Sequence, residues 1–305
     1  LVNYLSLLIP GAYYRRKLYE KVGNFSNNDA VQKRVDYYNK IDTVIDLNSK
    51  AIKLSDLKLE KGSKTYYFDL YEYSKYFDQE LKGHFLFGDI TKVPVEPSLV
   101  KSRPIGSNNA HSVLLKWNKL RHFTYVKNDK KEFLNKKNML VGRGKVHPPQ
   151  SHRIKFLEKY FGHPLCDIGK VNNNELDSKW LVNRMTIDEQ LEYKFILCLE
   201  GNDVASNLKW VMSSNSVAVM PKAKFETWFM EGLLIPDFHY ILIKDDYSDL
   251  ESKLRYYIEN PKKALDIIKN ANAHVAQFKD AMTEDIISLV VLKKYFEKTK
   301  QIVKS

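Results

Sequence analysis

Residues 193–231 read YKFILCLEGNDVASNLKWVMSSNSVAVMPKAKFETWFME, and this stretch is the clearest guide to the architecture. An apolar run at 193–199 ends abruptly at Glu200 and Gly201, where residues typical of turns and helix caps follow. Residues 205–212 are then predicted to be helical, and residues 216–220 are apolar again. The order strand, short polar turn, helix and strand is typical of a unit that joins two parallel strands.

The turn within this stretch suits a phosphate group. A chain that passes from a strand into a helix aims free backbone N–H groups and the positive helix end at one point. The alternative is an ordinary strand–helix–strand unit that binds no ligand. The residues predicted to approach a phosphorylated ligand here, with the helix starting near Asp203, are Gly201, Asn202, Asp203, Ala205 and Ser206.

Composition limits the class of protein. The chain has 305 residues, of which 44% are hydrophobic and 12% aromatic, enough for a large core and, by length, two domains. Cys166 and Cys198 cannot form a disulfide framework, which fits a reducing cytoplasm and argues against secretion. No Cys-x-x-Cys or paired-histidine motif is present, which disfavours a structural zinc site.

The formal net charge of +12 indicates anionic partners: nucleic acid, phosphorylated ligands or an anionic membrane surface. The excess is spread along the chain rather than concentrated in a recognisable motif, so we expect no nucleic-acid partner. No segment is long enough to cross a bilayer. An apolar run at 4–9 precedes Arg15, Arg16 and Lys17, a pattern that suits an anionic leaflet. A first helix packed on the core is the alternative.

Helices and strands alternate in the second half, which predicts an α/β fold with a parallel sheet covered by helices on both faces. A less regular pattern in the first half predicts a second Rossmann-like domain across a cleft. Ligands of such sheets bind beyond the carboxyl ends of the strands. The expected strands are 43–47, 65–70, 84–87, 139–141, 193–199, 216–220 and 239–243. The expected helices lie within 1–40, 69–81, 151–161, 186–190, 205–212, 247–259, 261–278 and 283–303, with a linker at 127–138.

Several spaced matches in sequence order indicate a known family. They are Glu192-Tyr193-Lys194-Phe195 leading to Gly201, Ala205-Ser206 with Lys209, Pro221-Lys222, His239-Tyr240-Ile241 with Lys244, and Asp249-Leu250. Over roughly residues 85–280 the chain resembles glycosyltransferase family 90, the CAP10-like group. This group includes capsule- and lipopolysaccharide-modifying enzymes of microbes and protein O-glucosyltransferases of animals.

The resemblance implies the GT-B fold. Two Rossmann-like domains then face each other across a cleft, and the last helix crosses back to the first domain. The expected domains are an acceptor-side domain at 1–130, a nucleotide-sugar-binding domain at 131–282 and the returning helix at 283–305.

For the catalytic base, the candidate is Asp89. It follows an apolar strand at 84–87, which places a carboxylate at the mouth of a sheet. The segment also resembles the family's strand that ends in an aspartate followed by a Val-Pro step, here Val93-Pro94, where the aspartate serves as base. The alternative is an aspartate that caps a turn through its own backbone.

Basic residues are the candidates for stabilising the departing diphosphate. The segment at 101–104 looks like the family's Ser-Lys-containing segment, and the one at 142–145 looks like its Arg-Gly segment. Animal members carry an arginine two residues before the lysine of the helix, where this chain has Asn207. Any single basic residue is more often a solvated surface charge. The donor-binding candidates outside the turn are Lys101, Ser102, Arg103, Arg143, Gly144, Lys145, Arg153 and Lys209, together with Glu231.

Acidic residues offer two further possibilities. One of Glu200, Glu226 and Glu231 is a candidate for bonding the ribose hydroxyls, with salt bridging as the alternative for each. The run Asp245-Asp246 with Asp249 resembles a metal-binding pair, but it precedes a predicted helix and is interpreted as a cap. The resemblance implies that basic residues and a helix end, rather than a metal ion, stabilise the diphosphate. We therefore expect no metal and no cofactor.

These expectations combine into one function. The resemblance implies an inverting transferase that moves glucose or xylose from a UDP-sugar donor to a hydroxyl of a lipopolysaccharide-core or capsule glycan or glycolipid. The Lys- and Asn-rich chain resembles the bacterial branch, which implies the cytoplasmic face of the inner membrane. The alternatives are a protein O-glycosyltransferase, which the two cysteines disfavour, and a nucleic-acid-binding protein.

Overall fold

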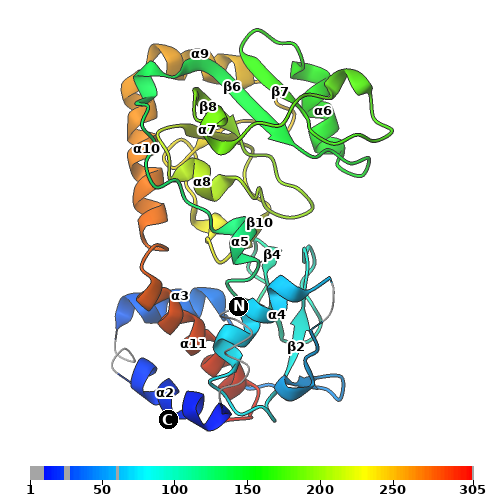
Figure 1. Ribbon diagram of the computed structural model, residues 1–305, viewed down its shortest axis with the longest axis vertical. Coiled ribbons are helices and arrows are strands. Elements are labelled where there is room, and N and C mark those ends of the chain that lie inside the picture. The colour runs from blue at the N-terminus through cyan, green and yellow to red at the C-terminus, as the bar shows by residue number, and fades with distance from the viewer. Residues whose placement is uncertain (1–9, 24–27, 60–61, 304–305) are drawn as a thin grey trace. The chain divides into compact units, whose positions relative to one another are not determined.

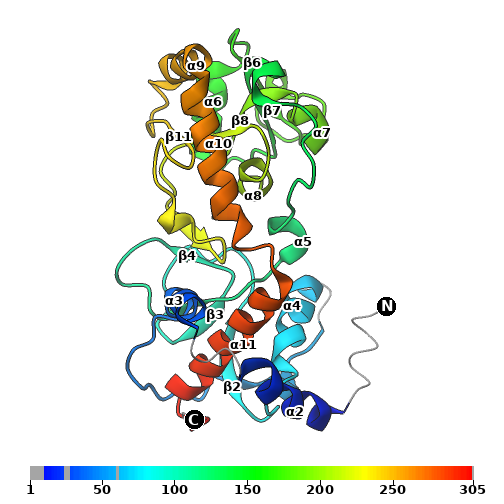
Figure 2. The same ribbon diagram turned by 90° about the vertical axis from the view of Figure 1, so that its left-hand side faces the viewer.

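The computed structural model describes residues 10–23, 28–59 and 62–303, and the chain divides into two compact units (Figures 1 and 2). Unit 1 comprises Leu1–Leu120, Phe225–Met230 and Phe278–Ser305, and unit 2 comprises Arg121–Lys224 and Glu231–Gln277. The first boundary thus falls after residue 120, and unit 1 also takes in a short segment at 225–230 that no composition change marks.

Unit 2 is built on a five-stranded sheet in the order β11-β9-β8-β6-β7. Every neighbouring pair in this sheet is parallel. The strands are β6 (Lys137–Gly144), β7 (Cys166–Lys170), β8 (Tyr193–Leu197), β9 (Val217–Met220) and β11 (Ile241–Leu242). The parallel α/β sheet expected from residues 193–220 is confirmed. The prediction was possible because strands that are buried on both faces of a sheet appear in the sequence as continuous apolar runs.

The helices of unit 2 follow the expected order (Figure 1). They are α6 (Ser151–Tyr160), α7 (Ile187–Gln190), α8 (Leu208–Met212), α9 (Leu250–Glu259) and α10 (Pro261–Ala276). The predicted capping box is present: the Thr186 side chain accepts from the Glu189 backbone, and the Glu189 side chain accepts from the Thr186 backbone. Apolar residues of α6, α9 and α10 pack with those of the strands into one core.

The strand order creates a switch point in this sheet. The chain leaves β6 to form β7 on one side, and then returns to form β8 on the other side of β6. Beyond the carboxyl ends of β6 and β8 the connecting segments therefore run to opposite sides, which is the usual ligand position in open α/β sheets.

The expected linker at 127–138 is wrong. Its residues pack in unit 2, where Phe133 is buried in the core within a 3-10 turn, η3 (Phe133–Asn135). Lys136 is also buried, and its Nζ lies 2.7 Å from Asp129 Oδ2 and 3.0 Å from Ser216 Oγ. A lysine-rich segment is expected to be solvated, and nothing in its own sequence shows that Phe133 and Lys136 are buried.

Unit 1 combines helices with a smaller sheet of order β1-β2-β3-β5. Its helices are α2 (Gly11–Val22), α3 (Asp29–Tyr38), α4 (Lys64–Ser74), α11 (Ala281–Lys298) and the first part of α5 (Lys119–His122). Its strands are β1 (Ile52–Lys53), β2 (Lys82–Leu86), β3 (Ser98–Val100) and β5 (Ser112–Leu114). β3 is parallel to both β2 and β5, while β1 is antiparallel to β2.

Two expected strands of unit 1 are wrong. Residues 43–47 form no strand, and residues 65–70 belong to α4. The tyrosines that favoured a strand instead stack at helical spacing, with the Tyr67 and Tyr71 rings 6.1 Å apart and nearly parallel. Strand propensity largely reflects how a side chain packs against its neighbours. Aromatic residues four positions apart can pack equally well along one face of a helix. The apolar run at 4–9 lies outside the described residues.

The last helix, α11, packs against α2, α3 and α4 of the same unit (Figure 2). Its buried Glu284 anchors it, with Oε1 2.6 Å from Arg34 Nη1 and Oε2 2.7 Å from Lys116 Nζ. A second contact between distant segments joins β10 (Phe225–Thr227) to β4 (Ser102–Pro104) in an antiparallel pair. Within the part of the chain that the structure describes, no helix combines the length and the apolarity needed to cross a bilayer.

The buried carboxyl group of Asp69 in α4 predicts a pH-dependent stability. Burial raises its pKa from 3.8 to about 6, although Oδ2 accepts a hydrogen bond from the Lys119 backbone N–H. A raised pKa in the folded chain means that this contribution to stability is complete below about pH 4 and is lost as the pH rises through 6. We therefore expect Asp69→Asn to stabilise the protein by about 2–3 kcal/mol at pH 7.5. Thermal unfolding measured at pH 4 and pH 7.5 should show that gain only at the higher pH.

Candidate active site

In unit 1, three predicted residues come together at the carboxyl ends of β2 and β3. The chain turns after β2 at Gly88, whose φ of +103° suits glycine, and then presents Asp89. Asp89 Oδ1 lies 2.5 Å from Lys101 Nζ, and the two side chains are 30% and 2% exposed. The Ser102 hydroxyl accepts from the backbone N–H of Ile90 at 3.1 Å. The carboxylate is thus held at the sheet edge with part of its surface open to solvent.

Arg103 lies in a different environment. Its side chain is 0% exposed, and its Nε lies 2.7 Å from Glu226 Oε1. The remaining guanidinium nitrogens donate to the backbone carbonyls of Tyr37, Tyr38 and Ser112. Arg103 and Glu226 therefore join α3, β4, β5 and β10 from inside. These buried contacts give Arg103 a structural role.

In unit 2, Arg153 lies at the switch point of the sheet. It occupies the first turn of α6, and its guanidinium donates to three backbone carbonyls. Nη1 donates to Lys145 just after β6 at 2.7 Å, while Nη2 and Nε donate to Leu199 and Glu200 just after β8, each at 2.8 Å. The positive charge is therefore fixed at the carboxyl ends of the two diverging strands.

In the part of the chain that the structure describes, Arg153 has no acidic partner. Among the described residues no carboxylate lies within ion-pair distance of its guanidinium, which bonds only to neutral carbonyls. Burial, reinforced by the charge of Arg121, lowers the pKa of Arg153 from 12.5 to about 10. Because a partly buried cation without a counter-ion is costly, this position favours an anionic ligand.

Two glycines keep space open beside Arg153. A side chain at Gly144 would place its Cβ 3.4 Å from Arg153 Nη1, and one at Gly201 would place it 3.6 Å from Nη2. Side chains larger than alanine at these positions would therefore crowd the guanidinium. Asn202 lies next to Gly201, with Oδ1 3.4 Å from Nε2 of the buried Gln150. The predicted residues Gly144, Lys145, Arg153, Gly201 and Asn202 thus come together.

Arg143 is not part of this group. Its side chain on β6 reaches back toward the amino ends of the strands, where Nη2 lies 2.5 Å from Asp167 Oδ1 at the start of β7. Asp167 also accepts a hydrogen bond at 2.5 Å from Tyr193 at the start of β8. The sequence placed Arg143 at a strand end because two glycines flank it. In the structure those glycines lie within β6 itself.

The expected helix end is wrong. α8 begins at Leu208 rather than near Asp203, and its five residues are too few to make a substantial dipole. Asp203 and Ala205 are buried, while Ser206 is partly exposed, in an irregular segment that precedes the helix. Asn207 Nδ2 donates to the Leu197 carbonyl at 2.9 Å. A helix terminus therefore offers a phosphate little electrostatic attraction at this point of the unit.

Comparisons with known proteins decide which family these sites belong to. The model of Glycosyl transferase family 90 matches residues 109–300. "O-glucosyltransferase LpsA" of Dichelobacter nodosus is 40% identical over 294 residues, which cover 95% of this chain and 91% of that protein. The chain belongs to glycosyltransferase family 90. "Uncharacterized protein 179R" of Invertebrate iridescent virus 6 is 32% identical over 97 residues, 30% of this chain and 8% of that protein.

As a member of this family, the chain is a glycosyltransferase, with a sugar donor and an acceptor as its substrates. Two predicted donor-binding residues of this transferase, Lys209 and Glu231, form a buried ion pair with each other. Lys209 Nζ lies 2.5 Å from Glu231 Oε1, and the two side chains are 0% and 1% exposed. The pair links α8 to the 3-10 turn η5 (Glu231–Leu233). Its burial indicates that it holds this part of the transferase together.

Replacing Lys209 tests that role. We expect Lys209→Met to destabilise the protein by about 3–5 kcal/mol, because the buried Glu231 carboxylate would lose the cation that lies 2.5 Å from its Oε1. The double variant Lys209→Met, Glu231→Leu should recover much of this loss. Thermal unfolding measures both, and nucleotide affinity should be unchanged in whichever variant folds. A folded Lys209→Met protein that loses nucleotide binding would instead assign Lys209 to the donor site.

Sequence reasoning missed residues that surround Arg153. His152 Nε2 lies 2.8 Å from the Glu200 carbonyl oxygen. Burial lowers the pKa of His152, and the charges of Arg153 and Lys224 act in the same direction. Tyr247 donates its hydroxyl hydrogen to the His152 carbonyl at 3.0 Å. The sequence does contain a hint of these residues. The loop His147-Pro148-Pro149-Gln150 connects the end of β6 to α6, at the edge of the sheet where ligands bind.

The acidic residues considered earlier have local partners. Glu200 Oε1 accepts from the Lys224 backbone N–H at 2.9 Å. Asp246 accepts from the backbone and hydroxyl of Ser248, and Asp249 Oδ1 accepts from the Lys244 backbone at 2.9 Å. The Asp249 side chain thus closes the preceding loop and does not cap α9 as expected. No group of three or more His, Cys, Asp or Glu residues suited to a metal ion occurs in the described ranges.

Proposed function

We propose that this transferase moves glucose from UDP-glucose to a hydroxyl of a bacterial surface glycan, with inversion at the anomeric carbon. The observation that carries the proposal is the uncompensated guanidinium of Arg153 at the switch point of a parallel sheet. The printed name of the Dichelobacter nodosus relative, an O-glucosyltransferase, supports glucose over xylose.

Arg153 would bind the diphosphate of the donor. Its guanidinium is already oriented by three carbonyls, so little conformational entropy is lost when an anion arrives. The same charge stabilises the negative charge that develops on UDP as the bond from the anomeric carbon to the phosphate oxygen breaks. Arg121 adds positive charge nearby, and the glycines at 144 and 201 admit the phosphate groups.

Asp89 would act as the general base. It would accept the proton of the acceptor hydroxyl while that oxygen forms a bond to the anomeric carbon from the face opposite UDP. UDP leaves with the electron pair of the broken bond, and the sugar is transferred with inverted configuration. Lys101 and Ser102 would fix the position of the Asp89 loop. We propose no metal in this reaction, because cationic side chains supply the charge stabilisation.

This chemistry requires the two units to adopt the GT-B arrangement, with the donor on unit 2 and the base on unit 1. The arrangement is part of the proposal. Its support is that each unit contains parallel strands and that each places its candidate residues at the carboxyl edge of those strands.

The acceptor would be a lipopolysaccharide-core or capsule glycan, assembled at the cytoplasmic face of the inner membrane. Support comes from α2, which contains one acidic residue, Glu20, and four basic residues: Arg15, Arg16, Lys17 and Lys21.

We expect the protein to bind phosphatidylglycerol vesicles. Changing Arg15, Arg16 and Lys17 together to Gln should weaken this binding by about 10²-fold, because each cation contributes about 1 kcal/mol. Vesicle sedimentation measures this. The triple variant of Lys155, Lys159 and Arg255 to Gln serves as control, and equal losses in both would contradict a specific role for α2.

A donor panel tests the proposed function. Release of UDP from UDP-glucose, UDP-xylose and UDP-galactose should be measured with and without bacterial core oligosaccharide. We expect UDP-glucose to be preferred, and we expect a product whose anomeric configuration, read by NMR, is opposite to that of the donor. Retention of configuration, or transfer only to folded protein acceptors, would contradict the proposal.

A further inference from the structure

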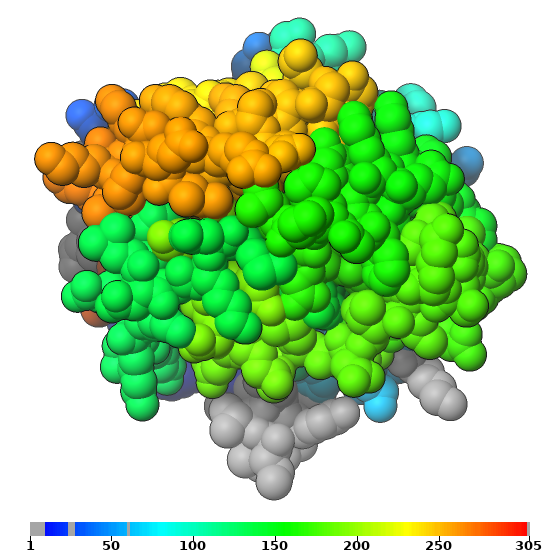
Figure 3. All heavy atoms as spheres, turned by 90° about the horizontal axis from the view of Figure 1, so that it is seen from above, coloured from blue at the N-terminus to red at the C-terminus, as the bar shows by residue number. Residues whose placement is uncertain are grey.

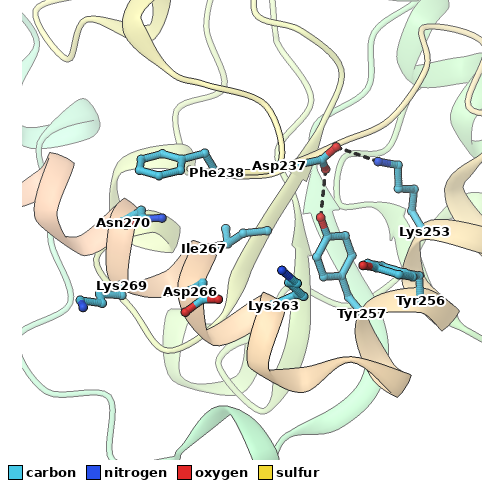
Figure 4. A pocket seen from close by; sticks show the side chains of 10 residues that line it. All are labelled: Asp237, Phe238, Lys253, Tyr256, Tyr257, Lys263, Asp266, Ile267, Lys269 and Asn270. Atoms are coloured by element: carbon cyan, nitrogen blue, oxygen red, sulfur yellow. Dashed lines mark hydrogen bonds and ion pairs between the residues drawn. The ribbon is translucent and has the colours of Figure 1, made fainter.

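A hollow in unit 2 lies away from the switch point. It has a volume of about 650 Å³ and is formed by the segment before β11 and by α9 and α10 (Figure 4). In Figure 3, α9 and α10 form the gold-to-orange part of the surface. Asp237 and Phe238 precede β11, whereas the Lys145, Leu199 and Glu200 carbonyls follow their strands. The hollow is therefore at the amino edge of the sheet, opposite Arg153.

One wall of the hollow is held rigidly. Asp237 Oδ2 lies 2.9 Å from Lys253 Nζ, and its Oδ1 accepts from the Tyr257 hydroxyl at 3.1 Å and from the Leu242 backbone at 3.3 Å (Figure 4). The φ of Asp237 is +52°, a conformation that is costly for a residue other than glycine. These bonds fix a carboxylate at the edge of a solvent-filled space.

The other walls combine aromatic faces with unused polar groups. Phe238 and Tyr256 are 46% and 47% exposed, an unusual degree for such large rings. Across from them, α10 contributes Lys263, Asp266 and Asn270, which lie one turn apart on one face. Within the described residues, these three side chains make no hydrogen bond or ion pair with one another or with any other residue. The hollow thus offers donors and acceptors without internal partners.

We propose that this hollow binds a saccharide unit of a glycan. Sugar rings present apolar C–H faces that pack on aromatic rings, and hydroxyl groups that need donors and acceptors together. The hollow supplies both, and its volume suits one to three sugar rings. Charges of both signs line it, which suits a polyhydroxylated ligand better than a phosphate or an anionic membrane. The site would hold part of a glycan chain away from the reaction centre, and it does not depend on which donor the enzyme uses.

The test uses the full chain, labelled with ¹³C in its tyrosine and phenylalanine rings. Maltotriose, cellotriose and xylotriose are titrated to 100 mM while the ring signals are followed by NMR. We expect saturable shifts of Tyr256 and Phe238 with at least one trisaccharide. Binding should weaken at least tenfold in Tyr256→Ala and in Asp266→Ala. Tyr19→Ala, which removes a ring that is 76% exposed on α2, should leave the titration unchanged.

Three outcomes would overturn the proposal. They are no saturable shift with any trisaccharide, equal binding in Tyr256→Ala, and vesicle binding that depends on Tyr256 without saccharide binding. UDP affinity is measured on the same samples and should be unchanged in Tyr256→Ala. Failure of the donor site at Arg153 would appear as lost UDP binding in the parent protein, so the two proposals can fail separately.

Discussion

Replacing Arg153 with methionine is expected to lower kcat/KM for the UDP-sugar by roughly 10²–10³-fold, as removal of one preorganised group that stabilises developing charge does in other enzymes. Methionine keeps much of the apolar stem and removes the charge that the three carbonyls orient. UDP affinity should fall together with the rate, because the diphosphate is bound in the ground state as well. Steady-state kinetics and calorimetric titration with UDP measure the two effects.

Two other arginines provide controls. Arg255→Met removes an exposed guanidinium whose Nη2 lies 2.7 Å from Glu251 Oε1 on α9, and it should change neither kinetics nor UDP affinity. Arg143→Met breaks the ion pair with Asp167 and should lower the unfolding temperature, while UDP affinity is retained. Arg153→Lys should recover part of the lost affinity if charge is what matters. Full UDP affinity in a folded Arg153→Met protein would remove Arg153 from the donor site.

Replacing Asp89 with asparagine is expected to reduce the rate of sugar transfer by roughly 10²–10⁴-fold, the usual contribution of a general base. Asparagine has nearly the same shape but cannot accept the acceptor proton. Binding of the donor should be unchanged, because Asp89 belongs to unit 1 and the residues around Arg153 to unit 2. The effect should therefore appear in kcat rather than in UDP affinity, which separates it from the Arg153 variants.

The Asp89 variant needs a stability control, because the buried Lys101 would lose its ion pair with Asp89. The double variant Asp89→Asn, Lys101→Met should restore the unfolding temperature without restoring transfer. Asp46→Asn removes another ion-paired carboxylate, 2.6 Å from Lys300 and largely exposed, and should have no effect on either. Unchanged transfer in the folded double variant would exclude Asp89 as the base.

The parts of the fold that the sequence predicts well are those set by local pattern. The alternation of apolar runs and turn residues at 193–220 gives β8 and β9 correctly, and the capping box at Thr186 and Glu189 forms as expected. Arg153 could be selected because a basic residue near the start of a helix that follows a strand lies at the ligand edge of a sheet. Asp89 could be selected because it directly follows an apolar strand in the first half.

What the sequence could not predict depends on partners that are distant in the chain. Arg103 forms its ion pair with Glu226, which is 123 residues away in the chain. The sequence around either residue therefore does not show whether the two bind each other or a ligand. Lys209 and Glu231 were both assigned to the donor, but they bind each other in the core. Charge alone indicates that a partner exists, and only the fold shows whether that partner is the protein or a ligand.

A crystal structure of the full chain with UDP tests the central claim most directly. The account predicts that oxygen atoms of the diphosphate lie within hydrogen-bond distance of the Arg153 guanidinium, between the segments that follow β6 and β8. A diphosphate bound elsewhere, with Arg153 still bonded only to the Lys145, Leu199 and Glu200 carbonyls, would contradict it.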